Sequence, residues 1–243
     1  MENDVMPERL DRFISENSHM TRSEAKKALA GGRVTVNGVT VKKGESKVTE
    51  NDDVTLDGKS LKAAGMVYIM LNKPAGVVSA TEDTRDKTVL DLVKENEEIY
   101  EKCPKSGLAP IGRLDKDTEG LLVISNDGML AHNLLSPAKH VEKEYLAECR
   151  GKLVENAVRL FEEGIQVGEE YKALPAKLTV VSENASGCTL KIVLTEGRFH
   201  QVKRMCHEVG AEVVHLTRIR FGKLVLPDDI KTGEMRFVGK EDI

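Results

Sequence analysis

The sequence predicts an α+β protein with a small helix–helix–hairpin domain over residues 1–60 and a larger domain over 61–243. The larger domain is expected to hold a mixed, mainly antiparallel sheet flanked by helices. Three observations predict this. Two helical patterns precede a hairpin signal in the first 60 residues. Segment 57–65, DGKSLKAAG, is small and polar, as a linker is. Beyond it, strand and helix patterns mix without βαβ regularity and often with hairpin-length gaps.

The first domain begins with a helix whose apolar residues Leu10, Phe13 and Ile14 share one face. Thr21 followed by Glu24 is a capping box for a second helix in TRSEAKKALAGG, and the first Gly of that segment, Gly31, is expected to end it in a left-handed conformation. In RVTVNGVTV, Asn-Gly between two alternating runs indicates a hairpin. VTENDDVTLDGK predicts a further strand and turn.

In the second domain, strands are predicted where apolar residues alternate or run together. These segments are 67–73, 121–125, 143–149, 177–182, 189–195 and the stretch from Val213 to Val225. Helical periodicity predicts helices over 88–96, 128–135, 154–164 and 200–209. In 154–164, the apolar face is expected to comprise Val154, Ala157, Val158 and Phe161.

The composition excludes several classes of protein. Hydrophobic residues make up 40% and charged residues 31% of the chain, which is typical of a globular protein. The longest run without Asp, Glu, Lys or Arg spans eleven residues, 128–138, whereas a membrane-spanning helix needs about 20 apolar residues. The N-terminus MENDVMPERL has no secretory signal. We therefore expect a cytoplasmic protein without a membrane partner.

The residues that commonly bind metals are poorly spaced for that purpose. The four cysteines form no CxxC pair, which argues against a zinc site and favours reduced thiols. His200, His207 and His215 lack the spacing of ligands on one helix. We expect neither a metal nor a cofactor.

Positive charge is concentrated in two stretches, although the net charge of the chain is −4. The stretch from Arg22 to Lys47 has a net charge of +5, and the stretch from Arg198 to Lys223 has +4. Local charge decides nucleic-acid binding more than the average does. Five basic residues of the first stretch are therefore candidate phosphate contacts: Arg22, Lys26, Lys27, Lys42 and Lys43.

The densest polar cluster is PIGRLDKDTEGLLVISNDG, residues 110–128, a charged loop between two apolar segments. Asp115 follows Leu114 and can be partly buried, with Arg113 near enough to bias its charge. An aspartate beside an arginine is more often a salt-bridged loop residue than a catalytic one. Asp115 and Asp117 are not expected to act as a hydrolytic pair, since in an extended loop they would point apart.

A second cluster, TEGRFHQVKRMCHEVG, follows a strand and opens a helix with Arg198, His200, Gln201, Lys203 and Arg204. Positive charge at a helix N-terminus is unfavourable. We therefore expect an anion nearby, either a carboxylate from elsewhere or a phosphate. The alternative is a solvated basic helix face.

Two further segments have sequence patterns that are typical of strands. LNKPAGVVSAT (71–81) is a strand end with a turn at Gly76. HVEKEYLAE (140–148) predicts a strand with Lys143 and Tyr145 on one face and Glu142 and Glu144 on the other.

Taken together, these segments resemble the motifs of the RsuA-type ribosomal RNA pseudouridine synthases. GRLDKDTEGLL resembles the catalytic motif, with Asp115 as the essential aspartate, and LNKPAG resembles the motif before it. Lys143 and Tyr145 match the motif of the active-site tyrosine, and EGRFHQVKRM matches the last motif. Residues 1–60 resemble the S-four-type RNA-binding domain, the alpha-L motif. Many members have Arg where this chain has Lys203, so either Lys203 or Arg204 is expected to contact Asp115.

The resemblance implies the pseudouridine synthase fold and isomerisation of uridine in RNA without a cofactor. Asp115 would attack C1′ or remove a proton from C2′, and Lys203 would keep it ionised. Tyr145 would stack on the uracil, and Leu194 would pack on the opposite side of the ring. Arg113 would fill the vacated space or hold a phosphate. The other implied RNA contacts are Lys143, Arg198, His200, Gln201 and Arg204.

The resemblance further implies small-subunit (16S) ribosomal RNA as the substrate, in a ribosomal subunit or an assembly intermediate. Related branches act on large-subunit RNA, which stays an alternative. A non-catalytic RNA-binding protein of ribosome assembly is the alternative from another class. We expect the chain to be a monomer.

Overall fold

The computed structural model describes residues 7–18, 20–49, 51–61, 65–104 and 107–243, which belong to two compact units. One unit comprises Met1–Val67 and Tyr100–Leu108, and the other comprises Tyr68–Ile99 and Ala109–Ile243. Helices accompany a mixed, mainly antiparallel sheet, so the expected α+β class is confirmed. Within the described ranges, no helix has the length and apolar character to cross a membrane.

The first unit has its own hydrophobic core between two helices and short strands. The helices are α1 (Leu10–Asn17) and α2 (Arg22–Ala30). A four-stranded sheet runs in the order β3 (Val39–Thr40), β2 (Val34–Val36), β5 (Val54–Leu56) and β6 (Lys59–Leu61), and β1 (Glu8–Arg9) pairs with β4 (Lys47–Val48). The core consists of Leu10, Phe13, Ile14, Ala25, Ala28, Leu29, Val34, Val48 and Val54. The predicted apolar face of the first helix is thus confirmed.

Local signals in this unit are confirmed in part. The capping box of Thr21 and Glu24 is present, and Asn37 and Gly38 have φ of 51° and 79°, as a tight hairpin turn requires. The expected left-handed residue after α2 is wrong by one position, because Gly31 has φ of −74° and Gly32 has φ of 72°.

The predicted linker over 57–65 is wrong for its first half. Asp57 and Gly58 form a second left-handed hairpin turn, and β6 completes the sheet. Leu61 packs against the core of the unit. The polar composition of this segment therefore belongs to an exposed hairpin, while 62–64 lie outside the described residues.

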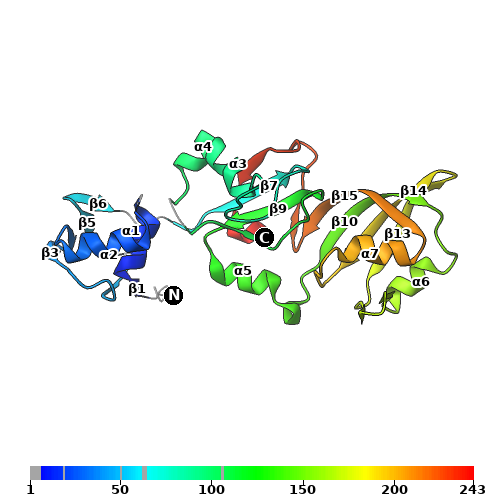
Figure 1. Cartoon of the computed structure of the whole chain (residues 1–243), viewed down its shortest axis with the longest axis horizontal. Coiled ribbons are helices and arrows are strands. Elements are labelled where there is room, and N and C mark those ends of the chain that lie inside the picture. Colours follow the sequence, from blue (N-terminus) through cyan, green and yellow to red (C-terminus); the bar gives the residue numbers. More distant parts are fainter. Residues whose placement is uncertain (1–6, 19, 50, 62–64, 105–106) are drawn as a thin grey trace. The chain divides into compact units, whose positions relative to one another are not determined.

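The second unit is built on one large sheet (Figure 1). Its path is β13 (Lys177–Asn184), β14 (Gly187–Leu194), β10 (Lys143–Gly151), β15 (Ala211–Phe221), β9 (Glu119–Ser125), β7 (Tyr68–Lys73) and β17 (Met235–Phe237). Two short strands pair off this path, β16 (Leu224–Val225) with β15 and β8 (Ala109–Ile111) with β9. Neighbours are antiparallel except β15 and β9, which are parallel where Arg218 faces Gly120.

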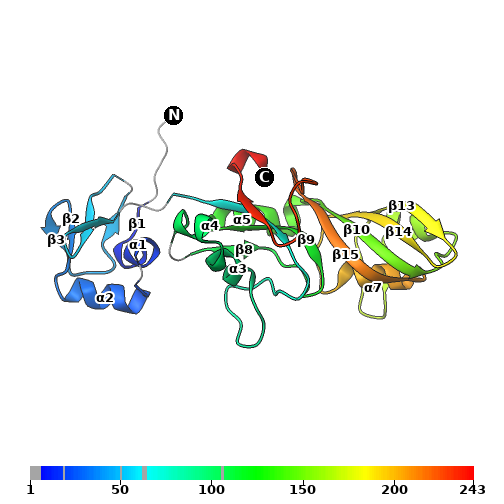
Figure 2. The same ribbon diagram turned by 90° about the horizontal axis from the view of Figure 1, so that it is seen from above.

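Helices lie beside this sheet in the second unit, as Figure 2 shows for α7. They are α3 (Val89–Glu95), α5 (Gly128–Leu135), α6 (Ala157–Glu162) and α7 (Gln201–Glu208), with short 3-10 turns at Pro137–Lys139 and Lys240–Asp242. Helix α4 (Glu97–Glu101) has residues of both units. A small hairpin of β11 (Gln166–Val167) and β12 (Tyr171–Lys172) packs near α7.

Five of the six predicted strand segments and the four predicted helix positions are occupied as expected. The stretch from Val213 to Val225 is instead two strands, β15 and β16, which pair with each other across a turn at Gly222. The helix predicted over 154–164 is shorter than expected. Only Ala157 and Phe161 are buried, whereas Val154 is 41% and Val158 40% exposed. The apolar spacing therefore overstated both the helix and its buried face.

Candidate active site

Asp115 lies in the loop between β8 and β9, and this loop is fixed by hydrogen bonds to its backbone. Its first turn closes where the Thr118 N–H donates to the Asp115 carbonyl at 3.1 Å. The Ser79 hydroxyl is bound to both backbone groups of the buried Leu114, at 3.0 Å each. The segment around Asp115 is therefore an ordered turn rather than an extended loop.

Lys73 supports the same turn from inside the unit and was missed as a functional residue in the sequence. Its ammonium donates to the carbonyl oxygens of Pro74 at 3.0 Å, Lys116 at 3.3 Å and Thr118 at 2.8 Å. The side chain is 0% exposed, and burial lowers the pKa of Lys73 to about 8. A lysine at the end of the apolar strand YIMLNK was the available signal.

The structure places Lys203, not Arg204, beside Asp115. Lys203 Nζ lies 3.6 Å from Asp115 Oδ2, and His200 Nε2 lies 3.7 Å from Oδ1. Arg204 turns to the β11–β12 hairpin, where its Nη2 lies 2.8 Å from Glu170 Oε1. Successive residues of a helix point about 100° apart, so only one of the two cations can face the turn.

Asp117 shares the ammonium of Lys203, which corrects the expectation that the two aspartates point apart. Lys203 Nζ donates to Asp117 Oδ1 at 2.6 Å, and this bond lowers the pKa of Asp117. The turn at 115–118 brings both carboxylates to one cation. Asp117 remains 73% exposed and Asp115 28%, so the two environments differ.

A small cavity of about 70 Å³ collects the predicted catalytic side chains. Tyr145 from β10 and Leu194 from the end of β14 line it together with Asp115 and Lys203. Tyr145 is 8% and Leu194 3% exposed. Four further predicted residues line the same cavity: Arg113, Arg198, His200 and Gln201. The topology thus joins β8–β9, β10, β14 and α7 at one place.

Two of the predicted RNA contacts are buried and hold the loop before α7 instead of facing solvent. Gln201 accepts the Arg198 N–H at 2.9 Å and donates to Glu196 Oε1 at 2.6 Å. Lys143 donates to the Thr195 carbonyl at 3.0 Å. Burial, with a smaller effect of Arg218, lowers the pKa of Lys143. These placements differ from the exposed phosphate contacts expected of them.

An anion was expected beside the start of α7, and the structure places carboxylates of the protein there. Asp115 and Asp117 lie at Lys203, while Glu196 accepts from Arg198 Nε at 3.2 Å. Arg198 is 56% exposed, and its guanidinium lies 4.3 Å from the centre of the Tyr171 ring. Arg113 is also exposed at the cavity.

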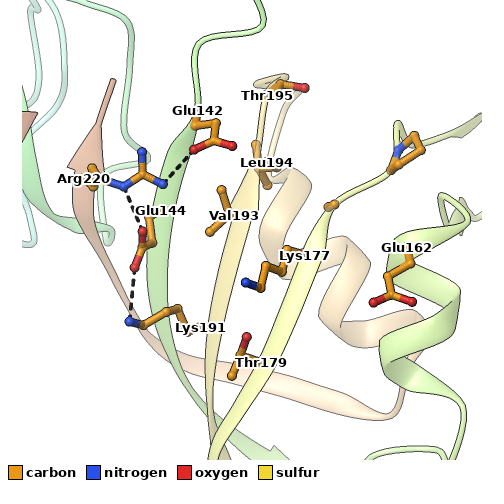
Figure 3. Close-up of a pocket in the computed structure, with 12 residues that line it drawn as sticks. Glu142, Glu144, Glu162, Lys177, Thr179, Lys191, Val193, Leu194, Thr195 and Arg220 are labelled. Atoms are coloured by element: carbon orange, nitrogen blue, oxygen red, sulfur yellow. Dashed lines mark hydrogen bonds and ion pairs between the residues drawn. The ribbon is translucent and has the colours of Figure 1, made fainter. Parts of the chain in front are cut away.

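A larger cavity of about 710 Å³ is lined by residues of β10, β13, β14 and β15 (Figure 3), and it shares Leu194 with the small cavity. Glu144 faces it, whereas its neighbour Tyr145 faces the small cavity, as the alternation of β10 predicts. Its charges are largely paired: Arg220 contacts Glu144 at 2.8 Å and Glu142 at 3.0 Å, and Lys191 contacts Glu144 at 3.3 Å. It contains neither Asp115 nor Lys203, so we place no chemistry there.

The first unit presents the predicted basic side chains on its surface. Arg22, Lys26, Lys27, Lys42 and Lys43 are all exposed. A buried carboxylate organises part of this surface: Asp11 accepts from Arg9 at 2.8 Å and lies 3.6 Å from Arg22 and 4.0 Å from Lys26. The hydrogen bond from Arg9 lowers the pKa of Asp11.

No three His, Cys, Asp or Glu side chains in the described part of the chain are arranged to hold a metal ion. The four cysteines are buried and form no disulfide bond with one another.

Comparison with known proteins identifies the family of this chain. Residues 67–208 match the family described as RNA pseudouridylate synthase, and residues 8–54 match the S4 domain. An RNA pseudouridine synthase of Aquifex aeolicus is 40% identical over 97% of this chain and 94% of its own length. Ribosomal small subunit pseudouridine synthase A of Escherichia coli is 37% identical over 97% of this chain and 98% of its own. A crystal structure of a pseudouridylate synthase matches with a TM-score of 0.64 and 34% identity, over 96% of this chain and 97% of that one. This chain therefore belongs to the RNA pseudouridylate synthase family, the enzymes that isomerise uridine to pseudouridine in RNA, and it carries an S4 domain.

Proposed function

We propose that this chain converts one uridine of small-subunit (16S) ribosomal RNA to pseudouridine and that Asp115 carries the reaction. The observation that carries the proposal is the position of Asp115, partly buried beside Lys203 in a cavity shared with Tyr145. The ribosomal target is supported by the similarity to small subunit pseudouridine synthase A of Escherichia coli and Yersinia pestis.

In the proposed reaction, the N1–C1′ bond breaks, the uracil turns, and C5 bonds to C1′. C5 then loses its proton and N1 gains one, so that the product is an isomer of uridine. Asp115 acts either by attack on C1′ or by removal of the C2′ proton, and both require an ionised carboxylate. Lys203 places a positive charge 3.6 Å from this carboxylate. Tyr145 stacks on the uracil and helps move the C5 proton, and Leu194 packs on the opposite side of the ring.

The target base must leave its stack, which costs a few kcal/mol and less in a loop or a single strand. Arg113 is exposed beside the cavity, where it can fill the vacated space or hold a phosphate. Arg198 and His200 extend the RNA contacts around Asp115, and the basic side chains of the S4 domain supply others. We propose that the enzyme acts as a cytoplasmic monomer on a ribosomal subunit or an assembly intermediate.

The test is turnover of ribosomal RNA tritiated at C5 of uridine. The wild-type chain should release tritium from small-subunit RNA. Asp115→Asn should lower the rate at least about 100-fold, because Asn keeps the shape but loses the nucleophile or base. Asp117→Asn is the matched control, since Asp117 is 73% exposed, and it should keep most of the activity.

The outcomes separate the alternatives. Release from large-subunit RNA alone would move the target to that subunit. Free uracil would indicate a hydrolase, and binding without tritium release would indicate an RNA-binding assembly protein. An active Asp115→Asn variant would show that another group carries the reaction.

A further inference from the structure

Phe199 is a large apolar side chain left exposed next to the active site. Its exposed fraction is 72%, and it precedes α7 in the segment EGRFHQ. Its ring stacks on that of His200, with the ring centres 3.8 Å apart and the planes 18° from parallel. No hydrophobic core accounts for this position, because one face of the Phe199 ring rests on His200 and the side chain otherwise remains open to solvent.

The backbone holds this stacked pair in place. His200 has φ of 49°, a left-handed conformation that is unfavourable for a side-chain-bearing residue and marks a position held by its surroundings. The segment before it is tied down where Gln201 accepts the Arg198 N–H. The His200 ring in turn lies 3.7 Å from Asp115. The exposed Phe199 ring is therefore positioned at a defined place relative to the reacting carboxylate.

The surroundings of Phe199 indicate what it contacts. Arg198 and Lys203 place two cations within four residues of it in the sequence, and both line the small cavity together with Arg113. A flat aromatic face among cations is the combination that binds single-stranded nucleic acid, since bases stack on the ring and phosphates meet the cations. A protein partner or a lipid surface would need a wider apolar area than this single ring.

We propose that Phe199, backed by His200, stacks on a nucleobase adjacent to the uridine that enters the active site. This assignment rests on the proposed role of Asp115. It gives the enzyme a second base contact, outside the cavity that holds Asp115. The contact holds the strand in place while the target uridine is out of its stack, and it selects substrates in which that neighbouring base is itself unpaired.

The experiment uses full-length chains carrying Asp115→Asn, so that the RNA is bound but not converted. The probes are two single-stranded RNA oligonucleotides, each with one uridine. One carries 2-aminopurine on the 5′ side of the uridine and the other on its 3′ side, and the fluorescence of 2-aminopurine is quenched when it stacks. With Phe199 intact, one of the two flanking positions should be quenched on binding. Phe199→Ala should remove this quenching and raise Kd about 5- to 100-fold, the range of one base–aromatic stack.

Three further variants sharpen the result. Phe199→Trp should retain both quenching and affinity, while Phe199→Leu should behave like Phe199→Ala because it lacks a flat face. The slope of log Kd against log salt should stay unchanged in all three Phe199 variants, since every cation that meets a phosphate is still present. Met129→Ala is the matched control, because Met129 is 70% exposed on α5 and away from the cavity.

Unchanged affinity or quenching in Phe199→Ala, full tritium release by a Phe199→Leu chain that keeps Asp115, or no quenching with Phe199 intact would each overturn the proposal. The results distinguish failure of the stacking proposal from failure of the proposed function. An active wild-type enzyme whose Phe199 variants bind and turn over RNA unchanged refutes only the stacking contact. Stacking without any conversion of uridine by the wild-type chain refutes only the assigned reaction.

Discussion

At the scale of the residue, the buried ammonium of Lys73 is held by carbonyl oxygens, which carry no net charge. Lys73 is fully enclosed, yet its three proton-donor positions meet three carbonyl oxygens of the adjoining backbone. Two of these oxygens belong to the turn that bears Asp115, so one side chain fixes the catalytic loop. Such satisfied hydrogen bonding is what makes a buried ammonium tolerable.

The substitution Lys73→Met tests the burial of this ammonium through the pH dependence of folding stability. Because burial lowers the pKa of Lys73 to about 8, the unfolded chain binds this proton more tightly than the folded chain. Stability of the wild type should therefore rise between pH 8 and 10.5, relative to the variant, by up to about 3 kcal/mol. Denaturant unfolding of both proteins at several pH values measures the difference. Lys94→Met, at an exposed side chain, is the control, and curves of Lys73→Met and wild type that run parallel would contradict the assignment.

The positions of single residues could be predicted from the sequence to different extents. Asp115, Tyr145 and Lys203 stood in recognisable motifs, and the structure brings them to one cavity. Lys143 and Gln201 stood in the same motifs but are buried, because strand alternation and the helix start turn them inward. Which of Lys203 and Arg204 meets Asp115 depended on the rotation of α7, and no local pattern fixes that rotation.

At the scale of the element, the meeting of β9 and β15 determines where the active site forms. These strands are the parallel pair within an otherwise antiparallel path, and they meet where Arg218 faces Gly120. Gly120 has φ of 99°, and a Cβ there would overlap the backbone of Arg218. The glycine therefore permits the close approach that places the Asp115 loop beside α7.

Gly120→Ala should destabilise the second unit by more than about 2 kcal/mol, since it adds both backbone strain and a clash with a neighbouring strand. Thermal or denaturant unfolding measures this loss. Gly128→Ala is the matched control, because a Cβ at Gly128 meets nothing within 4 Å, and it should change stability little. Equal effects of the two substitutions would show that β15 can move away without cost.

Elements were predictable where their signal was local. Alternating apolar runs gave the long strands, and Asn37-Gly38 gave a hairpin. The short strands β8 and β17 were not predicted, because three residues carry too little pattern and their pairing comes from β9 and β7. The linker was misplaced because the exposed hairpin strand β6 has the polar composition of a linker.

At the scale of the whole molecule, an acidic average hides separate basic surfaces. The net charge is −4, but basic side chains gather in the S4 domain and around the start of α7. Each of the two units has its own core, so each surface is displayed by an independent scaffold. We propose that the S4 domain holds the RNA backbone while the second unit performs the reaction, and that this arrangement limits indiscriminate binding.

Replacing Lys26, Lys27, Lys42 and Lys43 with Gln tests this division of roles. All four side chains are exposed, so the substitutions should leave the fold intact. For each lysine that meets a phosphate, its replacement should reduce the slope of log K against log salt by about 0.7 to 0.9, and the four together by up to about 3. Binding of ribosomal RNA between roughly 50 and 200 mM salt measures the slope.

The control replaces four other exposed lysines, Lys94, Lys139, Lys152 and Lys231, and matches the change in net charge. If both sets change the slope equally, only the total charge matters. If the first set leaves the slope unchanged, the phosphate contacts belong to the basic stretch from Arg198 to Lys223, and the S4 domain holds RNA by other means.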